Sequence, residues 1–170
     1  MLKLLTSASF AVLAAGLLVA TVVDLRTRRI PNILTGGMVS AGLGLAAFGF
    51  GGISVGAAVL GCVIGLVLML PGFALGATGA GDVKLMAAVG SLLGPLGVVY
   101  AVLYTAIVGG MLAVIVSLER RRLGAALAGT GRMIASPGDV KSEIASATPA
   151  SRFAYGPAIA AGSIIAALLR

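Results

Sequence analysis

The stretch Val83–Leu118 decides the fold: it reads VKLMAAVGSLLGPLGVVYAVLYTAIVGGMLAVIVSL and is almost entirely apolar. A single helix of this length would extend about 54 Å, whereas the hydrocarbon core of a bilayer is about 30 Å thick. The sequence Gly94-Pro95-Leu96-Gly97 offers a break, because proline cannot continue the backbone hydrogen bonding of a helix. The stretch therefore predicts two membrane helices, a short one over residues 83–93 and a full one over residues 96–118.

The composition of the whole chain points to the same environment. Of its 170 residues, 59% are apolar before the 26 glycines are counted, and only 10% are charged. Soluble domains are about 45–50% apolar with glycine included and about 25% charged. This composition excludes a soluble enzyme, a disordered tail and a disulfide-stapled secreted domain. The chain has no histidine and a single cysteine, Cys62, so we expect neither a metal nor a cofactor.

Four further stretches have about the length of a membrane span. They are Leu4–Val23, Ile33–Phe50, Ile53–Leu70 and Phe153–Leu169. The first could instead be a signal peptide, but its apolar run is long for one and further spans follow, which favours a retained helix. We therefore expect an all-α membrane protein: one domain over residues 1–170 forming a bundle of six transmembrane helices. The fourth helix is short, and a polar loop over about 119–152 joins the fifth to the sixth.

The formal net charge of +7 predicts the orientation of this bundle. With six spans, ten of the twelve basic residues lie on one side, leaving only Lys3 and Arg170 on the other. Basic loops remain in the cytoplasm, so the sequence predicts a multi-pass protein of the cytoplasmic (inner) membrane with both termini outside. Because the basic residues follow this pattern, we do not expect binding to nucleic acid.

Only five carboxylates exist, and two of them have an unusual position. Glu119, Asp139 and Glu143 belong to the polar loop, where they are most simply solvated surface charges. Asp24 and Asp82 lie at the cytoplasmic edges of apolar helices. A carboxylate at bilayer depth costs about 2.5–3.5 kcal/mol on insertion scales, so such residues usually mark a function or an ion pair.

Each of these two aspartates has an ordinary structural explanation as well. Asp24 could pair with Arg28 four residues later, and Asp82 could be a negative charge at a helix N-terminus, where the dipole favours it. Two converging carboxylates can also share a proton, one deprotonating a water while the other protonates a carbonyl or a leaving amine. Since Asp24 follows its helix and Asp82 begins one, the dipoles favour Asp82 as the base and Asp24 as the acid.

Two segments around these residues identify a family. Gly79-Ala80-Gly81-Asp82-Val83-Lys84, together with Asp24-Leu25-Arg26-Thr27-Arg28-Arg29-Ile30-Pro31-Asn32, resembles the type IV prepilin peptidases. These are intramembrane aspartyl proteases of the glycine-Xaa-glycine-aspartate type. The resemblance extends over nearly the whole chain and includes Tyr155-Gly156, although the family's proline is expected ahead of the tyrosine, where this chain has Ala154.

The resemblance implies an endopeptidase that cuts short basic leader peptides from pilin or pseudopilin precursors at the cytoplasmic membrane face. It carries Asp24 and Asp82 over as the catalytic pair. The remaining motif positions are Gly79, Gly81 and Lys84 in one segment and Ile30, Pro31 and Asn32 in the other. The chain lacks the large cytoplasmic loop with paired cysteines of the methylating members, so it looks like the short form associated with tight-adherence (Flp-type) pili. An archaeal preflagellin peptidase is similar in outline. The implied partners are the precursor, the lipid bilayer and the pilus-assembly machinery.

Two other classes of function fit the same residues. A small proton-coupled transporter or channel could use Asp24 and Asp82 as proton carriers, although two carboxylates at one edge form no relay across the membrane. A pilus-assembly scaffold without catalysis could use both residues only in structural pairs. Cleavage of a precursor without solute flux would exclude the first class, and survival of assembly in a double Asn variant would favour the second.

Overall fold

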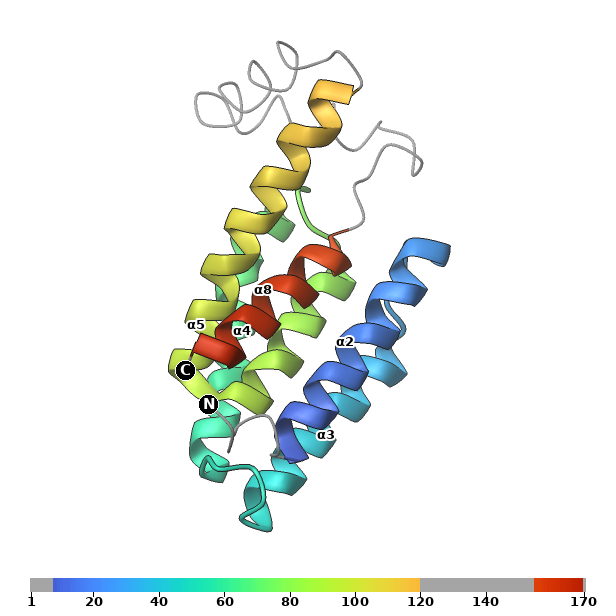
Figure 1. Ribbon diagram of the computed structural model, residues 1–170. Coiled ribbons are helices and arrows are strands. Elements are labelled where there is room, and N and C mark those ends of the chain that lie inside the picture. Colours follow the sequence, from blue (N-terminus) through green and yellow to red (C-terminus); the bar gives the residue numbers. More distant parts are fainter. Residues whose placement is uncertain (1–7, 120–154, 170) are drawn as a thin grey trace.

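The computed structural model describes residues 8–119 and 155–169, and every regular element within them is a helix (Figure 1). The helices are α2 (Ala8–Thr27), α3 (Asn32–Ala47), α4 (Val55–Ala74), α5 (Ala80–Glu119) and α8 (Gly156–Leu169). The predicted all-α class is confirmed for this part of the chain. The polar loop predicted over about 119–152 lies, apart from its first residue, outside the described residues, as does the beginning of the first predicted span.

The predicted break in the long apolar stretch is present. Within α5 the backbone leaves the helical conformation at Gly94, where φ is 72° and ψ is −175°. This region of backbone space is open essentially to glycine alone. A Cβ atom on Gly61 of α4 would meet Gly90 and Gly94 of α5, and a Cβ atom on Gly65 would meet Met86 and Val98. From Gly61 to Gly65, the contacts therefore run backwards along the first half of α5, from Gly90 to Met86. Along the second half they run forwards, from Gly94 to Val98. The two halves of α5 form a hairpin (Figure 1).

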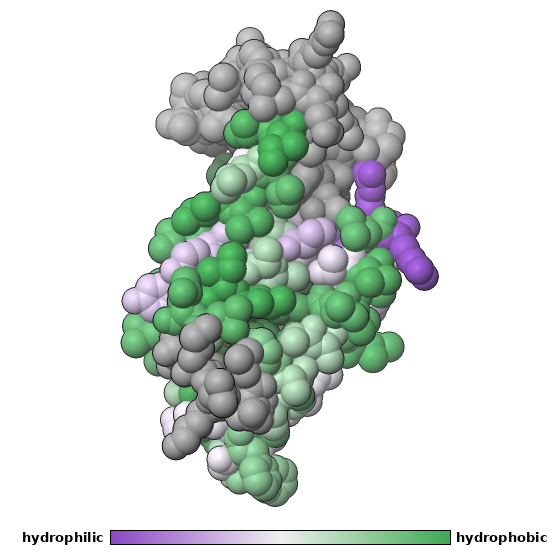
Figure 2. Space-filling view, viewed as in Figure 1, coloured by the Kyte–Doolittle hydropathy of each residue, from purple (hydrophilic) through white to green (hydrophobic). Residues whose placement is uncertain are grey.

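The outer surface of this bundle is apolar, as a bilayer requires. Within residues 8–119 and 155–169, three segments are long and apolar enough to cross a membrane, namely α2, α4 and residues 80–115 of α5, while α3 and α8 are shorter apolar helices. Many large apolar side chains of α4 and of the second half of α5 are exposed, and Figure 2 shows apolar residues over most of the visible face. A soluble protein rarely exposes so large an apolar surface. The chain is a membrane protein.

Glycines allow the helices to pack closely at some positions and not at others. Gly61 of α4 and Gly90 of α5 face each other so closely that neither leaves room for a Cβ atom. Gly65 likewise lies against the backbone of Met86. In contrast, Gly52 and Gly56 face open space. Glycine therefore allows close packing between α4 and α5, and this packing does not extend to Gly52 and Gly56.

Two helices end later than the sequence indicated, and both differences shape the end of the bundle discussed below. α2 continues beyond Val23 to Thr27, whose hydroxyl donates a 2.9 Å hydrogen bond to the Val23 carbonyl. A basic last turn is compatible with a helix because cations are favoured at its C-terminus. The turn between α2 and α3 is therefore limited to residues 28–31. α4 continues through Pro71 to Ala74, which leaves residues 75–79 to connect it with α5.

Most of the helix termini meet at one end of the bundle. α2 and α4 end there, and α3, α5 and α8 begin there (Figure 1). The opposite end contains the turn between α3 and α4, where the Ser9 hydroxyl near the start of α2 donates a 3.2 Å hydrogen bond to the Gly51 carbonyl. The residues of both sequence motifs lie at the first of these ends.

Candidate active site

Asp82 is held by the first turn of its own helix. α5 begins at Ala80, so Gly79 is the residue just before it and Asp82 is the third helical residue. The Asp82 Oδ2 atom accepts a 2.8 Å hydrogen bond from the Gly79 backbone N–H. A carboxylate at this position that reaches back to the preceding N–H is one half of a capping box. The spacing of Gly79 and Asp82 is therefore explained by helix capping, and the side chain is only 8% exposed.

Asp24 is held by a helix far away in the sequence. It lies one turn before the end of α2 and is only 6% exposed. Its Oδ2 atom accepts a buried 2.9 Å hydrogen bond from the backbone N–H of Gly156, the first residue of α8. The first N–H groups of a helix have no partner within the helix, so a carboxylate from another element can satisfy one of them. Asp24 thus caps α8.

The segment between α2 and α3 packs against the beginning of α5. A Cβ atom on Gly81 would lie 3.1 Å from Ile30 Cβ and 3.4 Å from the Ile30 backbone nitrogen. Ile30 is buried, and Pro31 precedes α3 with an extended backbone, its carbonyl accepting hydrogen bonds from Leu34 and Thr35. Because Gly81 has no side chain, Ile30 in the 28–31 turn can pack directly against the beginning of α5. This contact explains why Gly81 and Ile30 occur together in the two motif segments.

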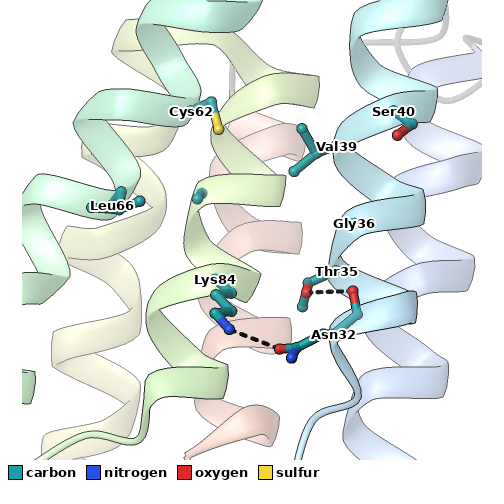
Figure 3. A pocket seen from close by; sticks show the side chains of 9 residues that line it. Asn32, Thr35, Gly36, Val39, Ser40, Cys62, Leu66 and Lys84 are labelled. Atoms are coloured by element: carbon teal, nitrogen blue, oxygen red, sulfur yellow. Dashed lines mark hydrogen bonds between the residues drawn. The ribbon is translucent and has the colours of Figure 1, made fainter.

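Lys84 and Asn32 connect the same two elements closer to the surface. The Lys84 ammonium donates a 2.8 Å hydrogen bond to Asn32 Oδ1, and Figure 3 shows the two side chains facing each other. They stand at one end of a cavity of about 440 Å³ between α3, α4 and α5. Cys62 lines this cavity and is half-buried. The Cys62 thiol is not fully buried because this face of α4 borders the cavity.

The charged and polar groups at this end act on one another. Asp24 and Asp82 are close enough for their carboxyl groups to influence each other electrostatically, and Asp82 is likewise close to the phenol of Tyr155. The structure therefore brings both aspartates, the two motif segments and the residue before α8 to one end of the bundle.

The surroundings of the two aspartates change one sequence-based expectation. Asp24 does lie near the C-terminus of α2, but its carboxylate also faces the N-terminus of α8. Asp82 faces the N-terminus of α5. Since a helix N-terminus favours a negative charge, both aspartates receive the same kind of support. The dipole argument for Asp82 as the base and Asp24 as the acid no longer holds.

Gly156 is not among the site residues that the sequence predicts. Its role depends on a contact between residues 132 positions apart, which no local pattern shows. The only available signal was the Tyr155-Gly156 pair at the start of the last apolar stretch. A second position missed is Gly109, in the second half of α5, where a Cβ atom would lie 2.8 Å from Cε2 of Tyr155.

Comparison with known proteins gives one match. A family model described as the type IV leader peptidase family matches residues 11–114, from the start of α2 to the second half of α5. The matched region contains Asp24, Asp82 and both surrounding segments, and it ends before α8. No curated protein and no solved structure matches the chain.

Proposed function

The chain belongs to the type IV leader peptidase family, whose model matches more than half of its residues, and is therefore a peptidase. From this premise we propose that it is an intramembrane aspartyl endopeptidase with Asp24 and Asp82 as its catalytic pair. The observation that carries the proposal is the placement of these two buried carboxylates at one end of the bundle. Each is oriented by a backbone N–H bonded to its Oδ2 atom. The proposed substrate is a pilin-like precursor of the Flp type, cut behind its short basic leader.

The two carboxylates are sufficient for peptide hydrolysis. One, ionised, takes a proton from a water while the other, protonated, donates its proton to the carbonyl oxygen of the scissile bond. The water oxygen bonds to the carbonyl carbon and forms a tetrahedral intermediate. When the C–N bond breaks, the carboxyl group that took the water proton donates it to the amine nitrogen, while a hydroxyl of the intermediate returns a proton to the other carboxylate. The products are a free carboxyl group on the leader and a free amine on the pilin. Both carboxylates then return to their starting states.

Asparagine variants provide the sharpest test of this proposal. An asparagine side chain can still accept the N–H bonds from Gly156 and Gly79, but it cannot exchange a proton. We expect Asp24→Asn and Asp82→Asn to insert and fold normally and to lose at least about 100-fold in cleavage rate, the lower range for general acid–base catalysis. The assay uses the purified protein in lipid with a pilin precursor. Asp139→Asn, in the polar loop, is the matched control and should cleave normally.

Either single Asn variant that cleaves at the wild-type rate would exclude the aspartyl mechanism. The double variant should be no worse than either single one, because the two residues act as a unit. Incorporation of labelled methyl into the processed pilin by the purified protein alone would contradict the proposed short form, which is expected to cleave without methyl transfer.

For the arrangement in the membrane we propose six crossings, with the aspartate end at the cytoplasmic face. The hairpin at Gly94 supports this number, since it divides α5 into two segments of opposite direction. The exposed side chains of Arg26, Arg28 and Arg29 at the same end support the cytoplasmic orientation, because basic residues remain on that side. The site then lies where a leader peptide is still in the cytoplasm and the pilin helix has entered the bilayer.

The shared location of the two aspartates also bears on the competing functions. A transporter needs carriers at successive depths, whereas Asp24 and Asp82 lie at the same end of the bundle. Proton or solute flux in liposomes without precursor cleavage would favour transport. Pilus assembly that survives in the Asp24→Asn/Asp82→Asn double variant would favour a scaffold.

A further inference from the structure

The first residue of α8 leaves Asp24 almost no freedom. A methyl group on Gly156 would lie 2.7 Å from Asp24 Oδ2, 3.0 Å from its Cβ and 3.1 Å from its Cγ. The first distance is shorter than real Cβ contacts show and the other two are unusually tight, so a larger residue here would force the Asp24 carboxylate or the α8 backbone to shift. The same residue donates the 2.9 Å hydrogen bond to Oδ2. Gly156 therefore both bonds Asp24 and confines its side chain.

The residue before Gly156 is itself fixed by a second glycine. The ring of half-buried Tyr155 packs on Gly109 in the second half of α5. A methyl group on Gly109 would lie 2.8 Å from Tyr155 Cε2, 3.2 Å from Cζ and 3.1 Å from the hydroxyl oxygen. At the next position, Gly110, a methyl group would meet nothing within 4 Å. The contact with Tyr155 is thus specific to one of two adjacent glycines.

We propose that Gly156 is a positioning residue for Asp24. In this proposal, the packing of the Tyr155 ring on Gly109 determines where the Gly156 N–H group lies. The inference rests on the proposed function, because it assigns these residues to the orientation of a catalytic carboxylate. It adds the end of the bundle formed by α8 and the second half of α5 to a site otherwise built from α2 and the beginning of α5. None of the three residues acts on the substrate directly.

Alanine variants of the glycines test this assignment with a control built into the chain. We expect Gly156→Ala to lower kcat at least about tenfold and to leave KM for the precursor unchanged, since it displaces a reacting group and no binding contact. Gly109→Ala should lower kcat several-fold, because a flexible ring can absorb part of the overlap. Gly110→Ala should remain within about twofold of wild type. Thermal unfolding of each variant in detergent shows whether the bundle remains folded.

A combined variant separates positioning from general packing. If Gly109 acts through Gly156, the Gly109→Ala/Gly156→Ala variant should be no slower than Gly156→Ala alone, because the contact it controls is already lost. Losses of kcat that add, or a change confined to KM or to thermal stability, would overturn the proposal. If Gly156→Ala does not fold, the pair Gly109→Ala and Gly110→Ala still decides it, and equal rates in the two would refute it.

Failure of this inference differs from failure of the proposed function. Wild-type rates in Gly156→Ala and Gly109→Ala, together with inactive Asp24→Asn, would leave the aspartyl mechanism intact and remove only the positioning role. A fully active Asp24→Asn would instead remove the proposed mechanism itself.

Discussion

At the scale of single residues, Asp24 and Asp82 have the same arrangement on different helices. In each case the Oδ2 atom accepts a backbone N–H at a helix N-terminus, from Gly156 in one case and from Gly79 in the other. The structural explanation that helix capping offers for Asp82 is therefore real, and it is compatible with the proposed catalytic role. Capping fixes the direction of each carboxylate, which is what a pair that exchanges protons requires.

This double role predicts that alanine and asparagine variants will differ in stability. Asp82→Ala and Asp24→Ala remove the acceptor of a helix N-terminal N–H, so each should lower the free energy of unfolding by about 1 kcal/mol, within the range of lost helix caps. Asp82→Asn and Asp24→Asn keep an acceptor and should remain close to wild type. Unfolding in detergent checks the difference. Equal stability of the Ala and Asn variants would show that the two N–H bonds contribute nothing to the fold.

At the scale of helices, the sequence predicted the features that depend only on residues close together in the chain. The apolar stretches and the Gly94 break follow from hydropathy and backbone conformation, and both are present. The ends of α2 and α4 were wrong by four residues each because charged residues and Pro71 are compatible with the last turn of a helix. The contact of Gly156 with Asp24 depends on how α8 packs on α2, and packing between distant segments leaves no periodic signal in the chain.

The contact between α4 and α5 gives a prediction at this scale. Gly61→Ala would force a methyl group into the backbone of Gly90 and Gly94, which cannot move without separating the two helices. We expect little folded protein from this variant, or a loss in stability of about 1–3 kcal/mol, as in overpacked cores. Gly56→Ala, five residues earlier on the same helix and facing open space, should behave as wild type. Comparable yields and unfolding midpoints would contradict the close contact.

At the scale of the whole molecule, the position of residues along the bundle predicts their accessibility. Thr27 and Ala77 are exposed at the aspartate end, whereas Gly51 lies in the turn at the opposite end. In a Cys62→Ala background, cysteines at 27 and 77 should react with an impermeant reagent only from the cytoplasm, and a cysteine at 51 only from outside. A cysteine at 130, outside the described residues, is predicted to react from the cytoplasm. Labelling of 27 and 51 from the same side would exclude the proposed topology.

The distance in sequence between Asp24 and its donor has a consequence for the timing of activity. Gly156 follows Asp24 by 132 residues, so a chain emerging from the ribosome contains both aspartates long before the N–H group that orients one of them. If that bond positions Asp24, the unfinished chain has no peptidase activity. Activity begins only after α8 has been synthesised and has packed against α2. A chain stopped after α5 should insert yet fail to cut the precursor, and α8 supplied as a separate fragment should restore cleavage. Cutting by the shortened chain alone would show that hydrolysis does not wait for the last helix.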